Sequence, residues 1–123
     1  MYAAKGGNQS QGYTYSGSND LNAVGWYSSN SGSTTHTVGA LAANELGTFD
    51  MSGNVWEWTW DIYGSYPSGT QTNPHGATSE SYRVVRGGGW NVTANGCRVS
   101  YRTYSDATDG YDFIGFRLCR VSP

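Results

Sequence analysis

The sequence predicts an α+β domain with a small twisted antiparallel sheet, few short helices and many loops. Three features of the composition carry this prediction: glycine supplies 18 of the 123 residues, aromatic side chains make up 15%, and charged residues only 13%. An average soluble domain has about 25% charged residues. Frequent glycines favour turns over long helices, while five tryptophans and ten tyrosines can bury enough surface to hold a loop-rich chain together. The length fits a single domain over residues 1–123.

Helix signals are confined to the N-terminal part of the chain. Residues 2–5 read as the last turn of a helix that the glycine pair 6–7 ends. The Ser-Asn-Asp sequence at residues 18–20 is a capping sequence for a short helix over residues 21–23.

Loops and short strands account for the rest. Residues 28–37 are polar apart from one glycine and predict a loop with no reason to pack, and residues 64–82 predict a second, longer loop with two prolines. Val, Tyr, Trp and Phe, which suit a pleated sheet, gather in four strand candidates: residues 55–61, 82–86, 97–101 and 116–121. In the first candidate, Trp56, Trp58 and Trp60 alternate onto one face, which we expect to be core.

The charge pattern argues against nucleic acid as a partner. The net charge is -2 and the arginines are dispersed, so no basic stripe can follow a phosphate backbone. The sequence has no apolar run of about 18 residues, and we expect no membrane insertion. Met1 is not followed by a charged and then apolar leader, so the localisation stays unknown from this chain.

Three blocks in a fixed order carry a family resemblance. They are Asp-Met-Ser-Gly-Asn-Val-Trp-Glu-Trp at residues 50–58, Arg-Val-Val-Arg-Gly-Gly-Gly-Trp at 83–90 and Gly-Phe-Arg-Leu at 115–118. The chain resembles the formylglycine-generating-enzyme, or sulfatase-modifying-factor, domain, which has a variant of the C-type lectin fold. The resemblance therefore implies a C-type-lectin-like fold. Family domains usually begin well upstream of a block like residues 2–7, so the chain resembles the C-terminal part of such a domain or a minimal form of it.

The first block offers a possible metal site. Asp50, the carbonyls of Gly53 and Val55, and Glu57 present hard oxygen ligands that a tight turn could gather around one calcium ion. In the enzymes that the chain resembles, the matching positions bind a structural calcium. The alternative is that Glu57 accepts hydrogen bonds from the turn and Asp50 caps it, with no ion.

Thiol chemistry is disfavoured by the cysteine count. The enzymes that the chain resembles oxidise a substrate cysteine with oxygen and use two cysteines, which bind copper(I), shortly after the block at residues 83–90. Here the first of that pair falls near Val92 and only Cys97 matches the second, so we expect no copper. Whether Cys97 pairs with Cys119 is open from the sequence. Two histidines are too few for the three-histidine iron site of a second enzymatic branch.

The segment of residues 91–113 suggests recognition. It is rich in Tyr, Ser, Thr, Asn, Asp and Gly, the palette of evolved binding surfaces. In this respect the chain is similar to the variable proteins of diversity-generating retroelements, in which adenine-directed mutagenesis of AAC codons randomises a C-terminal segment. An AAC codon changed at its first two positions never encodes Lys, Glu, Gln, Met or Trp. None of these five follows Trp90, although they supply 14 of the first 90 residues.

On this interpretation some positions of the C-terminal part hold the scaffold and others contact a ligand. The expected scaffold positions are Cys97, Arg98, Arg102, Ile114, Gly115 and Phe116. The expected ligand contacts are Thr93, Asn95, Tyr101, Thr103, Tyr104, Ser105, Asp106, Tyr111, Asp112 and Phe113. The aromatic members would supply most of the binding energy.

The sequence therefore predicts a non-catalytic ligand-binding domain whose partner is a protein or a surface ligand, displayed on a virion or a cell surface. The alternative is a formylglycine-generating enzyme or an accessory subunit of one, with Cys97 as its remaining catalytic cysteine. An ordinary irregular loop at residues 91–113 is the plain alternative to a recognition segment.

Overall fold

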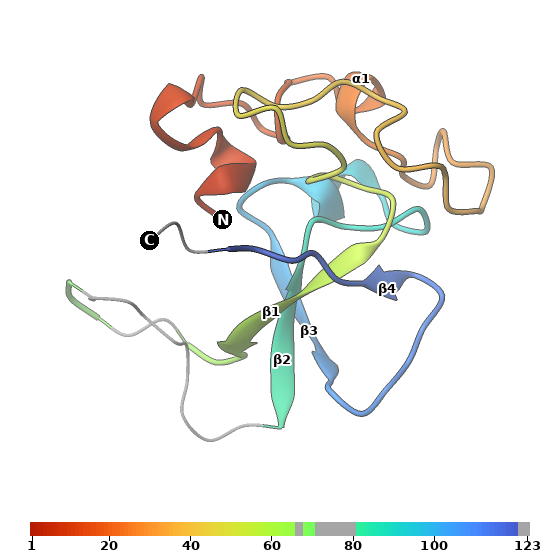
Figure 1. The fold of residues 1–123 in the computed structure, drawn as a ribbon. Helices are drawn as coiled ribbons and strands as arrows, with labels where there is room; N and C mark the ends of the chain where they lie inside the picture. The colour runs from red at the N-terminus through yellow and green to blue at the C-terminus, as the bar shows by residue number, and fades with distance from the viewer. Residues whose placement is uncertain (66–67, 71–80, 121–123) are drawn as a thin grey trace.

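The computed structural model describes residues 1–65, 68–70 and 81–120. Figure 1 shows two layers, with loops and short helices of the N-terminal half lying above a small twisted sheet. The described elements are η1 (Ala3–Lys5), η2 (Gly7–Gln9), α1 (Leu21–Val24), β1 (Trp56–Ile62), β2 (Tyr82–Arg86), η3 (Ala94–Cys97), β3 (Arg102–Asp106) and β4 (Ile114–Gly115), where η marks a 3₁₀ helix. None of the described helices has the length and apolar character needed to span a membrane.

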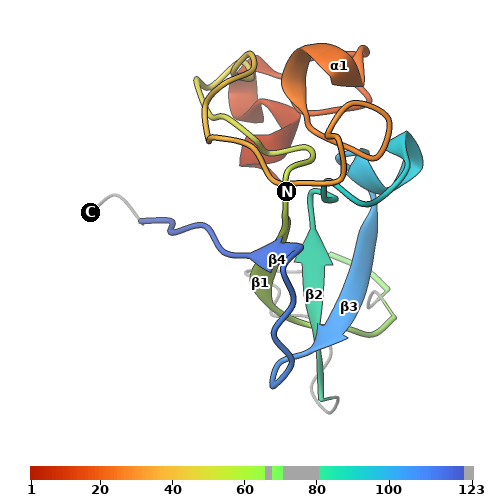
Figure 2. The same cartoon turned by 90° about the vertical axis from the view of Figure 1, so that its right-hand side faces the viewer.

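The sheet has four strands in the order β3-β2-β1-β4. Strands β1 and β2 pair antiparallel, as do β2 and β3, whereas β4 runs parallel to β1 with Ile114 opposite Trp56. The predicted α+β class and small sheet are confirmed, but the sheet is mixed rather than antiparallel. The reason is the connection at residues 107–113, which returns along the length of the sheet from one edge to the other instead of closing a hairpin (Figure 2).

The predicted helices form where their capping signals lie. Gly6 ends η1 in the left-handed conformation, with φ of 85°, and its N–H donates to the Ala3 carbonyl. Asp20 precedes α1, and its Oδ1 accepts a hydrogen bond of 3.0 Å from the Asn22 N–H. Both short helices therefore begin or end for local reasons that the sequence contains.

Two of the four strand predictions hold. Strand β1 is shifted by one residue toward the C-terminus from its predicted range, and β2 matches its predicted range. The third prediction, residues 97–101, is wrong because Cys97 ends η3 inside the core and pairing starts only at Arg102. The fourth, residues 116–121, is wrong because the strand ends at Gly115; Phe116 is 76% exposed, and residue 121 lies outside the described residues.

The core lies between the two layers and includes buried side chains of strand β2. Leu21, Val24 and Cys97 form one buried cluster, and Val84 and Val85 of β2 are 2% exposed. The prediction of a tryptophan core holds for Trp56, which is 6% exposed, but fails for Trp60, which is 78% exposed. The pairing of β1 with β2 is irregular between Trp58 and Ile62, so the outer end of β1 leaves the packed face.

The polar loop at residues 28–37 is mostly exposed, as predicted, but it is anchored at Ser31 and His36. Ser31 is 1% exposed and donates from Oγ to the Trp90 carbonyl at 2.8 Å. The ring of His36 stacks on Trp26 with centroids 3.8 Å apart. Asn54 fixes the loop further, because it accepts from the His36 N–H and donates to the His36 carbonyl. Side-chain hydrogen bonds therefore replace apolar packing in this loop.

Candidate functional site

The segment of residues 91–113 runs along one edge of the sheet and ends at the other. Figure 2 shows it passing through η3 into β3, then returning through residues 107–113 to β4. Strands β3 and β4 are the two edges of the sheet. Residues from this segment therefore cover the full width of the lower layer rather than one loop tip.

The start of the segment is anchored in the core. Gly96 and Cys97 are buried, and the Cys97 side chain belongs to the cluster around α1. The Cys97 carbonyl accepts a hydrogen bond of 2.8 Å from Ser52 Oγ, and Ser52 is 1% exposed. This tie joins the segment to the motif at residues 50–58.

The ten predicted ligand contacts divide into two groups by exposure. Five are exposed: Thr93, Asn95, Tyr104, Tyr111 and Asp112. Five are half-buried: Tyr101, Thr103, Ser105, Asp106 and Phe113. None of the ten lines any of four cavities found among the described residues.

Tyr101 is shared between this surface and the core. Its ring centroid lies 6.0 Å from that of Trp56, and the Arg98 guanidinium carbon lies 5.8 Å from the Tyr101 ring. The Tyr101 carbonyl accepts a hydrogen bond from Arg86 Nη1. Tyr101 is thus a packing residue on one side, which the sequence did not indicate.

Tyr104 belongs to an exposed aromatic group, named here the tyrosine cluster. Its ring lies 4.5 Å from Tyr63 and 4.8 Å from Tyr82, all between centroids. Arg102 stands over Tyr63 at 4.9 Å and donates from Nη2 to the Gly64 carbonyl at 2.6 Å. A cavity of about 400 Å³ lies beside the cluster and is lined by Tyr63, Gly64, Ser65, Tyr82 and Arg102.

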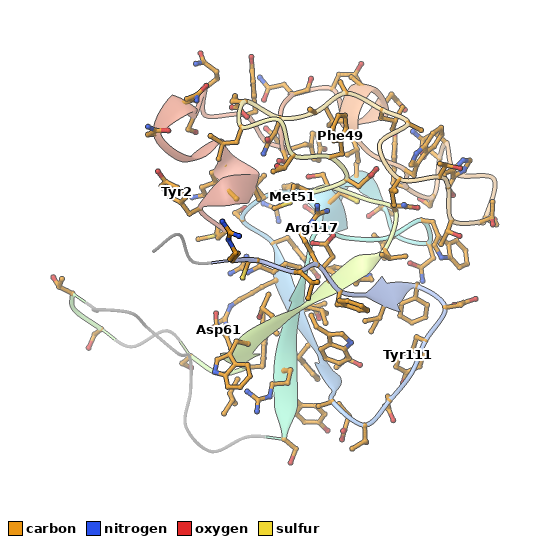
Figure 3. All side chains as sticks on the ribbon, viewed as in Figure 1. Tyr2, Phe49, Met51, Asp61, Tyr111 and Arg117 are labelled. Carbon is orange, nitrogen blue, oxygen red and sulfur yellow. The ribbon has the colours of Figure 1, made fainter. Side chains whose placement is uncertain are left out.

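A second aromatic pair lies on the connection to β4. The rings of Tyr111 and Phe113 stack with centroids 4.9 Å apart and planes inclined by 16°. The Tyr111 hydroxyl donates to Asp109 Oδ2 at 3.0 Å, and this hydrogen bond raises the pKa of Tyr111. Figure 3 shows Tyr111 on the loop at the lower right, well away from Arg117.

Asp106 orders the turn that follows β3. Its Oδ1 accepts hydrogen bonds from the Thr108 N–H at 3.0 Å and from Thr108 Oγ1 at 2.8 Å. The bond from the Thr108 N–H contributes most to lowering the pKa of Asp106. One carboxylate oxygen of Asp106, a predicted ligand contact, is therefore already hydrogen-bonded within the loop.

The four predicted calcium ligands surround one cavity. Asp50, Gly53, Val55 and Glu57 all line a space of about 500 Å³ that Phe49, Phe116 and Arg117 also line. Asp50 Oδ2 accepts from the Gly39 N–H at 2.7 Å, whereas Asp50 Oδ1 is buried and has no hydrogen-bond partner among the described residues.

Arg117 occupies the centre of this site. Its Nη2 lies 2.7 Å from Glu57 Oε1, and its Nε donates to both carboxylate oxygens of Glu57. The described residues contain no group of three or more His, Cys, Asp or Glu side chains that could hold a metal ion. These residues do not fit a calcium ion while the guanidinium holds Glu57, and the metal-free alternative differs from this arrangement because Glu57 accepts from Arg117 and not from the turn.

The cysteines do not form a reactive pair. Cys97 is fully buried, and burial raises the pKa of its thiol to about 12. Cys119 is exposed, and neither thiol is in a disulfide. Val92, at the position of the first copper cysteine in the enzymes, packs against the core cluster. His75, the other histidine besides His36, lies outside the described residues.

Sequence reasoning missed three parts of this surface. Tyr63 and Tyr82 lie outside the segment of residues 91–113 but complete the tyrosine cluster around Tyr104. Arg117 was noticed only as part of a motif, and its contact with Glu57 has no signal in the sequence because 60 residues separate the two. Phe116, expected to hold the scaffold, instead lines the cavity beside Arg117 and is mostly exposed.

Known proteins resemble the chain in both fold and sequence. Treponema denticola variable protein 1 superposes with a TM-score of 0.84 and 38% identity over 94% of this chain and 42% of its own. The chaperone protein LppX of Paenibacillus barcinonensis is 37% identical over 97% of this chain and 45% of its own length. The formylglycine-generating enzyme of Mus musculus is 34% identical over 68% of this chain and 23% of its own length.

This chain thus spans less than half the length of each of these relatives. The family model for the sulfatase-modifying factor enzyme 1-like domain matches residues 1–122. The three motif blocks, the small mixed sheet and these similarities agree, and the chain belongs to the family of sulfatase-modifying factor enzyme 1-like domains.

Proposed function

We propose that this domain is a non-catalytic binding module that recognises a partner through residues 91–113. The observation that carries the proposal is the division of this segment between anchored and exposed positions. Gly96 and Cys97 are buried, whereas Thr93, Asn95, Tyr104, Tyr111 and Asp112 are exposed. A segment of this kind can change its exposed residues without disturbing the fold, as a variable protein requires.

The form of the surface favours a macromolecular partner over a small molecule. Small-molecule sites are concave and bury most of their ligand. Tyr104 instead lies on an edge strand, and Tyr111 and Asp112 lie on the connection that follows it. Tyrosines such as Tyr104 and Tyr111 supply rigid contact area at low entropic cost. We therefore expect the partner to be a protein or another molecule on a cell surface. We also expect the domain itself to be displayed on a virion or a cell.

An enzymatic role is the second candidate, because relatives include proteins named as formylglycine-generating enzymes. The residues present support it less well. A thiol nucleophile or copper ligand must be a thiolate, and the buried Cys97 with its raised pKa is not one near neutral pH. Val92 can neither bind a metal nor attack a substrate.

Two matched display libraries test the binding role. The first randomises the five exposed contacts of the segment. The second randomises five exposed residues of the N-terminal layer: Asn8, Gln9, Asn19, Asn22 and Thr37. Both are displayed on yeast and selected against one purified protein, such as lysozyme. We expect folded, specific binders with micromolar or tighter dissociation constants from the first library only.

Equal enrichment from both libraries would contradict the proposal, because the segment would then have no special role. An assay for aldehyde formation on a cysteine peptide, with copper and oxygen, tests the enzymatic candidate directly. Turnover by the wild-type domain that Cys97→Ala abolishes would favour the enzyme. A neighbouring reverse-transcriptase gene with an imperfect repeat of the last 40 or so codons would support the variable-protein role, and a neighbouring sulfatase gene would count against it.

A further inference from the structure

We propose that the guanidinium of Arg117 is the resident cation of residues 50–57, in the place where the family resemblance implies calcium. The inference is independent of what the segment of residues 91–113 binds. It concerns the motif that joins the N-terminal layer to strand β1. Figure 3 shows Arg117 directly beneath the loop that carries Phe49 and Met51.

The guanidinium contacts one of the predicted calcium ligands, Glu57, and two backbone carbonyls, those of Phe49 and Asp50. Nη2 donates to Glu57 Oε1 at 2.7 Å, to the Phe49 carbonyl at 2.8 Å and to the Asp50 carbonyl at 3.2 Å. Nε donates to Glu57 Oε1 at 3.1 Å and to Oε2 at 3.0 Å. Three oxygen-bearing groups from two stretches of chain thus converge on one positive charge.

The geometry distinguishes this contact from an ordinary surface ion pair. Both oxygens of Glu57 face the planar guanidinium, which is the forked arrangement that arginine forms with carboxylates. The Glu57 side chain is 18% exposed and that of Arg117 35%, so the pair is partly removed from water. Hydrogen bonding to Glu57 raises the pKa of Arg117, which favours the charged guanidinium.

Calcium and Arg117 cannot use Glu57 at the same time. A calcium ion in this motif would need the carboxylate oxygens that the guanidinium now engages, and it would place a double positive charge beside a single one. Without Glu57 the predicted site keeps Asp50 Oδ1, which is buried and has no partner among the described residues, and the carbonyls of Gly53 and Val55, three oxygens against the six or more ligands that calcium takes. The motif is therefore complete without the metal.

Arg117 also ties together parts of the chain that are distant in sequence. Glu57 lies in β1, Phe49 and Asp50 lie in the loop before it, and Arg117 follows β4 at the edge of the sheet. A cation is needed here because the two carboxylates of Asp50 and Glu57 line one cavity. The chain supplies that cation from its own C-terminal motif.

Thermal unfolding of the wild-type chain tests the inference without any substitution. Melting is followed in metal-free buffer, with calcium chloride and with the chelator EGTA, and calcium chloride is titrated in by calorimetry. We expect equal melting temperatures in all three conditions and no heat of binding. A rise in melting temperature with calcium, or a fall with the chelator, would overturn the inference.

Substitution then tests the role of the side chain. Arg117→Gln should melt well below wild type, and Arg117→Lys should fall between them because it keeps the charge but loses the fork. Arg120→Gln removes the same charge from an exposed position three residues along and is the matched control. Equal melting temperatures for Arg117→Gln and Arg120→Gln would overturn the inference.

The response of Arg117→Gln to calcium shows whether both cations use the same oxygens. With Glu57 released, we expect calcium to raise the melting temperature of this variant although it leaves wild type unchanged. Adding Glu57→Gln to the variant should abolish that rise. Failure of calcium to stabilise Arg117→Gln would overturn the claim that the two cations share one place, and the wild-type measurement remains decisive if the variant does not fold.

Discussion

Gly88 and Cys97 lie so close that the cysteine sulfur fills the space a side chain at Gly88 would need. A β carbon on Gly88 would come within 2.5 Å of Cys97 Sγ and 2.9 Å of Cys97 Cα, and the φ of Gly88 is 75°. Replacing Gly88 with alanine should therefore destabilise the domain by about 2–4 kcal/mol, from left-handed strain and overpacking together. Urea unfolding of Gly88→Ala measures this loss.

Gly110→Ala is the control for this prediction. Nothing lies within 4 Å of a β carbon placed there, and the residue is exposed. We expect its free energy of unfolding to stay within about 0.5 kcal/mol of wild type. A Gly88→Ala variant as stable as Gly110→Ala would mean that the Gly88 turn can move away from Cys97.

The contact also illustrates what the sequence could predict. A run of glycines such as residues 87–89 is typical of a close backbone approach, and Gly88 makes one. What approaches could not be read from the sequence, because Cys97 reaches Gly88 through tertiary packing. The same limit explains why strand β3 was predicted at the wrong residues. Residues 97–101 and 102–106 both contain residues that suit a strand, and only tertiary packing decides between them.

Arg117 shows a different limit. The motif blocks identified the residues that meet at the cavity, including Asp50, Glu57 and Arg117. They could not say that the arginine faces the carboxylate, because 60 residues separate the two in the chain. The ten ligand contacts remain predictions, and the structure adds where each lies and how far it is buried.

The Cys97 thiol should be unreactive in the folded domain and should make stability depend on alkaline pH. Its pKa is raised by burial from 9.0 to about 12, so the unfolded state loses the proton first as pH rises. The free energy of unfolding should therefore fall between about pH 9 and pH 12, by at most about 1.4 kcal/mol per pH unit from this group. Urea unfolding at several pH values measures the slope.

Comparison with Cys97→Ala isolates the contribution of this group. The free energy of unfolding should fall less steeply with pH in the variant, by a difference that corresponds to at most one proton. A thiol reagent at pH 8 should label the exposed Cys119 at once and Cys97 only on unfolding. Equal labelling rates for the two cysteines in the folded domain would contradict the prediction.

Asn54 should be intolerant even of its closest isostere. It is 5% exposed, and its side chain accepts from the His36 N–H at 2.9 Å and donates to the His36 carbonyl at 3.1 Å. Asn54→Asp keeps the shape but removes the donor and places a carboxylate against a carbonyl. We expect a loss of about 2–3 kcal/mol, measured by urea unfolding.

Asn8→Asp makes the same change of charge at an exposed position and should leave stability nearly unchanged. Hydrogen exchange of Asn54→Ala gives a second readout, because this variant lacks the acceptor of the His36 amide, which should therefore exchange faster. If that amide exchanges as slowly as in wild type, the loop at residues 28–37 is held by something other than Asn54.

The predicted aromatic contacts should separate into one that supports folding and others that do not. Tyr101 packs against Trp56, so Tyr101→Ala should cost about 2 kcal/mol of stability. Tyr104 and Tyr111 are 48% and 46% exposed and pack mainly against other surface rings, so Tyr104→Ala and Tyr111→Ala should each cost less than about 1 kcal/mol. Some binders selected from the display library will lack Tyr104 or Tyr111. Putting that tyrosine back into such a binder should strengthen its binding with little change in its melting temperature. If Tyr104→Ala and Tyr111→Ala unfold as readily as Tyr101→Ala, these rings are part of the core, and the recognition surface must lie elsewhere in the described part of the chain.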